Sequence, residues 1–164
     1  MKIINSRGDS FALQVVGYQY PQHKEKNKYD PNWLLIQIHA TLNGESWTAT
    51  DPCLLTWEVE YLIKWLARID KGEPTRRLRC SFIEPYLVLE QRETEAGKAL
   101  RVYLERQLRP KSAYNHFAGQ EDFWIEFPYS EIQFASVVES LQAQLGRFPK
   151  RVMDLITRRD LLEP

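Results

Sequence analysis

The sequence has only two cysteines, no long hydrophobic run and no excess of either charge. Cys53 and Cys80 alone are too few for a disulfide-rich secreted scaffold or a zinc site. No apolar run approaches about 18 residues, the length of a membrane-spanning helix, and the first residues lack the apolar core of a signal peptide. These absences favour a cytoplasmic protein that does not contact a membrane. Because 22 Lys and Arg residues balance 22 Asp and Glu residues, nucleic acid is not the expected partner.

The motifs of the common phosphate, metal and hydrolase sites are missing too. The seven glycines form no glycine-rich phosphate-binding loop, and neither a zinc-protease motif nor a nucleophile elbow occurs. The three histidines, His23, His39 and His116, stand far apart along the chain. The sequence therefore predicts no metal, no cofactor and no enzymatic activity. An enzyme with a cleft near the sheet stays open as an alternative, with Glu84, His39 or a Cys53–His39 nucleophile pair as candidate groups.

Length and hydrophobic periodicity predict one domain over residues 1–164. A chain of 164 residues suits a single core. Alternating apolar residues indicate strands near 11–15, 33–42, 78–82, 87–89, 100–104 and 123–127, and a strand at 45–50 that returns from the hairpin turn Asn43-Gly44. Apolar stripes indicate two helices. One covers 56–71, capped by Thr56 and ended by Gly72, and the other covers 134–145, preceded by a capping box of Ser130 and Gln133.

The resulting order, βββαββββα, is typical of an α+β fold in which helices cover an antiparallel sheet. We therefore expect one sheet of about six to seven strands with two main helices packed on it. The loop 22–32 and the C-terminal tail 150–164 are peripheral in this scheme. The segment 109–120 is expected to be a loop, and a short third helix is an option near 152–159.

Acidic and aromatic residues gather in two stretches that we interpret as a partner-binding surface. Residues 84–95 hold four Glu and one Arg, and residues 120–131 hold four acidic residues and no Lys or Arg. If their strands are neighbours, they form one patch that attracts a basic protein, with tryptophans as anchors. The alternative is an ordinary solvated face balanced by Arg101, Arg106 and Arg109. The residues predicted for the patch are Glu90, Glu93, Glu95, Glu121, Asp122, Glu126, Trp124 and Trp33.

Several short segments, in their order and spacing, carry a family resemblance. They are Gly17-Tyr18-Gln19-Tyr20-Pro21, Tyr29-Asp30-Pro31-Asn32-Trp33-Leu34, Pro52-Cys53-Leu54-Leu55-Thr56-Trp57-Glu58 with Trp65-Leu66, Glu84-Pro85 and Phe148-Pro149. Over about residues 11–151 they resemble the WapI-type immunity proteins of bacterial toxin–immunity systems. Pro31 departs from the pattern, in which a small residue such as Ala is expected. The resemblance implies a protein that binds and blocks a cognate toxin domain, often a nuclease, and it implies no particular contact residues.

The sequence thus favours a non-enzymatic inhibitor whose partner is a cognate protein toxin domain. A basic nuclease is the candidate class for that toxin. A general protein–protein adaptor or a self-assembling subunit stays open beside the enzyme alternative. The sequence does not fix the oligomeric state.

Overall fold

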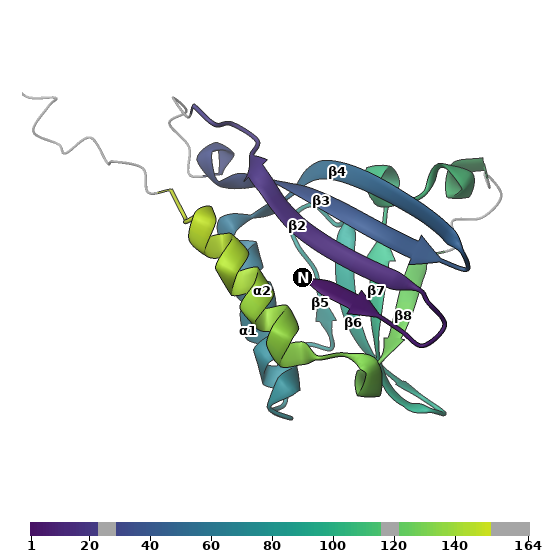
Figure 1. Ribbon diagram of the computed structural model, residues 1–164. Helices are drawn as coiled ribbons and strands as arrows, with labels where there is room; N and C mark the ends of the chain where they lie inside the picture. Colours follow the sequence, from purple (N-terminus) through teal and green to yellow (C-terminus); the bar gives the residue numbers. More distant parts are fainter. Residues whose placement is uncertain (23–28, 116–121, 152–164) are drawn as a thin grey trace, which may run out of the picture.

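The computed structural model describes residues 1–22, 29–115 and 122–151. In these residues eight strands form two four-stranded antiparallel sheets, and the chain has two α-helices. The first sheet has the order β1-β2-β3-β4, formed by Lys2–Ile4, Ser10–Tyr18, Trp33–Leu42 and Glu45–Leu55. The second has the order β5-β6-β7-β8, formed by Arg79–Cys80, Leu87–Thr94, Gly97–Leu104 and Trp124–Pro128. The two sheets face each other, and helices α1 (Thr56–Asp70) and α2 (Phe134–Arg147) lie side by side along one flank (Figure 1).

The α+β class and the two main helices are confirmed, but the single sheet of six to seven strands is wrong. The strands before α1 pair with one another, and so do the strands after it. Hydrophobic periodicity locates strands but does not predict which strands pair, so the division into two sheets could not be predicted from the sequence. The unpredicted strand β1 has three residues, too few for an alternating pattern to be recognised. The strand predicted near 78–82 is present as β5, but it is only two residues long.

The two predicted turns are confirmed by their backbone angles. Asn43 and Gly44, between β3 and β4, have φ values of 50° and 85°, which is the left-handed geometry that a two-residue hairpin turn requires. Helix α1 ends at Asp70, and Gly72 follows with a φ of 67°, as expected for a glycine beyond a helix C-terminus.

The predicted helix caps are wrong at both helices. Leu55, not Thr56, is the N-cap residue of α1, and the Glu58 carboxylate accepts the Leu55 N–H at 2.9 Å. Helix α2 has Gln133 as its N-cap residue without a side-chain cap, and Ser130 lies in a short 3-10 helix, η4 (Tyr129–Glu131). At α1 the Thr56 hydroxyl donates to Asn32 instead of capping the helix. At α2 the 3-10 helix η4 takes up Ser130, so the predicted capping box does not form.

Two short 3-10 helices, η1 (Asp30–Asn32) and η3 (Lys111–Asn115), lie in the segments expected to be loops. A further one, η2 (Arg106–Leu108), follows β7. The optional helix near 152–159 lies outside the described residues.

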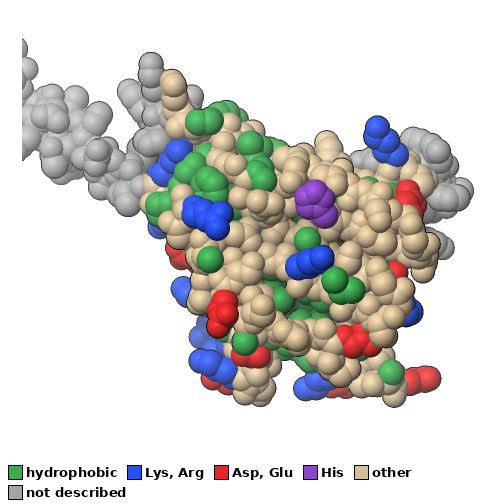
Figure 2. Space-filling model, viewed as in Figure 1, with side chains coloured by type: hydrophobic (Ala, Val, Ile, Leu, Met, Phe, Trp, Pro, Cys, Tyr) green, Lys and Arg blue, Asp and Glu red, His purple; other side chains and the backbone are tan. Residues whose placement is uncertain are grey.

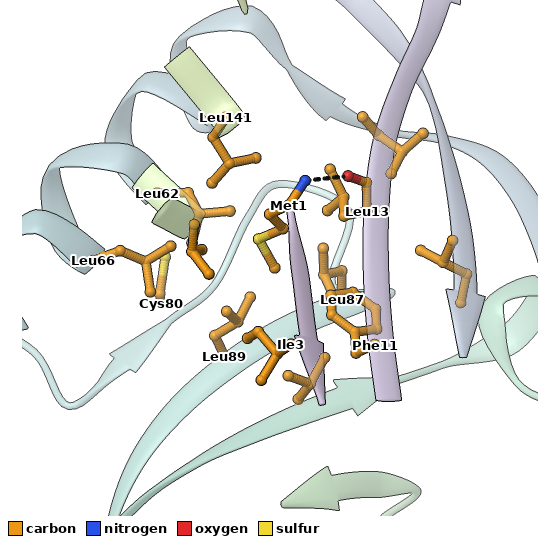
Figure 3. Close-up of a cluster of buried hydrophobic side chains, with 14 of the residues drawn as sticks. Met1, Ile3, Phe11, Leu13, Leu62, Leu66, Cys80, Leu87, Leu89 and Leu141 are labelled. Carbon is orange, nitrogen blue, oxygen red and sulfur yellow. Dashed lines mark hydrogen bonds between the residues drawn. The ribbon is translucent and has the colours of Figure 1, made fainter. Parts of the chain in front are cut away.

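One cluster of buried apolar side chains lies between the two sheets and the helices. In Figure 3, Met1, Ile3, Phe11 and Leu13 of the first sheet meet Leu87 and Leu89 of the second, Leu62 and Leu66 of α1, and Leu141 of α2. Next to β1, the Met1 amino group donates a hydrogen bond to the Leu13 carbonyl at 2.7 Å. Each sheet therefore turns one face to this core and the other face away from it.

Candidate functional site

The outward face of the second sheet gathers charged and aromatic side chains. Alternation along β6, β7 and β8 points Leu89, Leu100, Val102, Ile125 and Phe127 into the core cluster. The intervening side chains point the other way. We call this surface the charged face, and its members are Arg79, Glu90, Arg101, Tyr103, Trp124 and Glu126.

Strand register places four of these residues in one row across the sheet. Arg79 is paired with Glu90, Glu90 with Arg101, and Arg101 with Glu126. The charges therefore alternate from strand to strand, which is the favourable arrangement for directly opposed residues. The Arg101 Nε donates to the Glu126 carboxylate at 2.7 Å, and this hydrogen bond raises the pKa of the Arg101 guanidinium.

Two aromatic rings are held in place by the same charges. The Arg101 guanidinium lies 4.0 Å from the centre of the Trp124 ring, which is 36% exposed. The Tyr103 hydroxyl donates to Glu90 at 2.6 Å, and burial together with this bond raises the pKa of Tyr103. The Arg79 guanidinium lies 5.0 Å from the Tyr103 ring. The charged face is thus an ordered set of cation–π contacts and hydrogen bonds.

The structure brings together only part of the predicted patch. Glu90, Glu126 and Trp124 share the charged face, with Arg101 between the two carboxylates. Glu93 and Glu95 are exposed at the β6–β7 hairpin, and Asp122 is exposed just before β8. Trp33 lies half-buried at the start of β3, in the other sheet. Glu121 lies outside the described residues.

Sequence reasoning missed Arg79 and Tyr103 as members of this surface. Their role depends on strand register, which pairs Arg79 with Glu90 and Tyr103 with Trp124. The β6–β7 hairpin, with its turn at 95–96, could have supplied that register for Glu90 and Arg101, because a hairpin turn fixes which residues are opposed.

The candidate catalytic groups do not come together. His39 is exposed on the outward face of the first sheet, where its ring nitrogens contact Gln37 at 3.2 Å and Thr48 at 2.8 Å. Cys53 is fully buried in the core, and burial raises the pKa of its thiol. Glu84 lies near Asp51, whose pKa is raised by burial and by the Glu84 charge. The Cys53–His39 pair considered from the sequence is therefore not formed.

No metal site stands out in the part of the chain that the structure describes. Within residues 1–22, 29–115 and 122–151, no three His, Cys, Asp or Glu side chains are placed to hold an ion together. None of the helices described there is long and apolar enough to cross a membrane.

Hydrogen bonds of the buried Asn32 side chain join Thr56 and Arg151, and we call these three residues the polar clamp. Asn32 and Thr56 belong to the segments that carry the family resemblance. The Asn32 side-chain oxygen Oδ1 accepts hydrogen bonds from the Thr56 hydroxyl at 3.0 Å and from the Arg151 backbone N–H at 2.8 Å, and its side-chain Nδ2 donates to the Arg151 backbone carbonyl at 3.0 Å. Nearby, the Tyr18 ring meets the Phe148 ring edge-on at 5.6 Å. Segments far apart in the sequence thus meet at one end of the molecule.

The model of the immunity protein WapI-like family matches residues 2–149, nearly the whole chain. No curated protein and no solved structure matches the sequence or the fold.

Proposed function

The chain belongs to the immunity protein WapI-like family, and we propose that it is a cytoplasmic, non-enzymatic protein that binds a cognate toxin domain and neutralises it. The observation that carries this proposal is the family match over residues 2–149. A toxin-neutralising role needs a binding surface and no reactive centre.

We place the toxin contact on the charged face. Trp, Tyr and Arg are the residue types that most often dominate the free energy of protein–protein binding. Trp124, 36% exposed, lies there against Arg101, and the buried ring of Tyr103, 6% exposed, lies beside them as support. Their positions are held by the Arg101–Glu126 and Tyr103–Glu90 hydrogen bonds. Such preorganisation lowers the entropy that is lost when a partner binds.

The exposed carboxylates at the ends of the second sheet give this surface a preferred partner charge. Glu95 and Asp122 are exposed, and Glu93 is exposed opposite Lys98 in the β6–β7 register. The carboxylates of Glu90 and Glu126 have arginine neighbours. Exposed charges at the edge of an interface mainly accelerate association with a partner of opposite sign. A basic toxin domain, such as a nuclease, fits this arrangement.

The test is binding and rescue with any toxin domain encoded beside this gene. The wild-type chain is expected to restore growth of cells that express the toxin and to form a one-to-one complex in calorimetry. Trp124→Ala should weaken binding at least tenfold, as expected for a central aromatic anchor. Tyr61→Ala is the matched control, because Tyr61 is an exposed aromatic residue on α1, away from the second sheet.

Two failures are distinguishable in this experiment. No rescue and no complex with the wild-type chain would refute the inhibitor function itself. Rescue and binding that are unchanged by Trp124→Ala, with Glu93→Lys and Asp122→Lys leaving the association rate unchanged at low salt, would refute the charged face as the contact.

A further inference from the structure

A groove runs between α2 and the first sheet where that sheet lacks a strand. Strand β1 pairs only with residues 10–12 of β2, and Met1 adds one more backbone pair with Leu13. Beyond that point α2, rather than a strand, lies beside β2 (Figure 1). The groove between them has a volume of about 380 Å³, within the range of binding pockets for small ligands and peptide side chains.

Small polar side chains form the helix wall of the groove. Ser136, Ser140 and Gln144 lie four residues apart on α2 and therefore share one face. The Gln144 side-chain carbonyl accepts the Val15 N–H at 2.7 Å, and its amide approaches the Leu13 carbonyl at 3.4 Å. This side chain thus contacts the backbone groups of β2 that a neighbouring strand would use.

Both walls of the groove carry a positive charge. Lys2 stands on the sheet side and Arg147 on the helix side, and His39 also lines the groove, while none of its lining residues is Asp or Glu. No ion pair of Lys2 or Arg147 is seen among the described residues. Figure 2 views the molecule from this side, and the area around the purple histidine, His39, shows no red acidic side chain.

We propose that this groove binds a short acidic peptide segment in extended conformation. Its cations, hydroxyls and amides match carboxylates and peptide groups. The Leu13 backbone and the Val15 N–H on this edge of β2 are already bonded to Met1 and Gln144, so the side chains of the groove, rather than strand pairing, hold the peptide. From Ser136 to Arg147 the helix wall extends about 16 Å, which matches about three to five extended residues. This inference does not depend on the toxin partner, because it concerns a different surface from the charged face.

The test uses acetylated tetra-glutamate amide as the probe and amide NMR of the full chain as the readout. Saturable shifts are expected at Leu13, Gln14 and Val15 and along 136–147, and they should weaken as salt is added. Tetra-glutamine amide, the uncharged analogue, should bind much more weakly. Arg147→Gln and Lys2→Gln should each reduce the affinity about two- to fivefold, the range for exposed charge pairs.

Lys64→Gln is the matched control, because Lys64 is an exposed lysine on α1 that does not line the groove. Shifts that avoid the groove, or equal effects of Arg147→Gln and Lys64→Gln, would overturn the proposal. Inorganic phosphate forms the second arm: saturation of the same amides by phosphate at the peptide's concentration would show a general small-anion site and also overturn it. Because Arg147 is exposed, Arg147→Gln should leave the fold intact, and a loss of peptide affinity in this variant reports on the groove.

Discussion

Replacing Asn32 with Ala should destabilise the protein by about 3 kcal/mol. Asn32 is 1% exposed, and its side chain makes one hydrogen bond to the fully buried Thr56 hydroxyl and two to the Arg151 backbone. Each such bond contributes about 1 kcal/mol net. The truncation also leaves the Thr56 hydroxyl buried without this acceptor, which adds to the cost rather than offsetting it.

Urea and thermal unfolding measure this loss. For a chain of this size, a change of about 3 kcal/mol corresponds to a fall in melting temperature of about 6–12 °C, and the urea midpoint should fall with an unchanged slope. Thr56→Val removes one of the three bonds and should cost about 1 kcal/mol. In the double variant Asn32→Ala/Thr56→Val, the loss should be smaller than the sum of the single losses, because both changes remove the same bond.

A loss of less than about 1 kcal/mol for Asn32→Ala, the net contribution of a single hydrogen bond, would contradict this role of the Asn32 side chain. That result would mean that residues 148–151 are held by the ring contacts of Tyr18 and Phe148 rather than by the clamp.

Three further predictions concern single groups. Tyr129→Phe should stabilise the protein by up to about 1 kcal/mol in urea unfolding, because the Tyr129 hydroxyl is buried without a hydrogen-bond partner among the described residues; a clear destabilisation would contradict this. Burial raises the pKa of the Glu58 carboxyl although the N–H groups of Leu55 and Ile83 lower it. The folded state therefore holds this proton more tightly than the unfolded state, so its contribution to stability is greatest below the unfolded pKa and declines as the pH rises through the folded pKa. As the pH rises through the folded pKa, the free energy of unfolding of the wild type should therefore fall relative to that of Glu58→Gln. Free energies that keep a constant difference across the pH range would contradict this. Finally, the single changes Arg101→Glu and Glu126→Arg should each cost about 1 kcal/mol, whereas the double swap should cost less than their sum; additive losses would show that the pair is not coupled.

The sequence predicted the elements better than their assembly. Helix α1, the Asn43-Gly44 hairpin and β3 follow from local rules, because periodicity and turn geometry act over a few residues. The two-sheet arrangement depends on contacts between distant segments, such as the hydrogen bond from Asn5 on the β1–β2 turn to the Glu126 carbonyl of β8. Thr56 shows the same limit: its hydroxyl was expected to cap α1, but it donates to Asn32, which lies before β3.

The candidate site shows this limit more sharply. The two acidic stretches were expected to combine if their strands were neighbours, but β7 lies between β6 and β8 and brings Arg101 between Glu90 and Glu126. Composition along the chain could not reveal this insertion, because β7 follows β6 in sequence but its pairing with β8 spans the segment 105–123. The exposed acidic residues, Glu93, Glu95 and Asp122, lie at the ends of the strands instead.

An alternating row of charges discriminates between partners more than it raises affinity. The Arg101–Glu126 pair is already satisfied, with the two side chains 22% and 24% exposed, so a partner gains little from simply covering it. A partner that places a charge of the wrong sign over either residue loses the pair and is rejected. In the complex proposed above, the affinity is expected to come chiefly from Trp124, which lies against Arg101 and is 36% exposed. If the charged face is the toxin contact proposed above, selectivity can change through the charges at Glu90 and Glu126, while Trp124 on Arg101 is kept as the anchor.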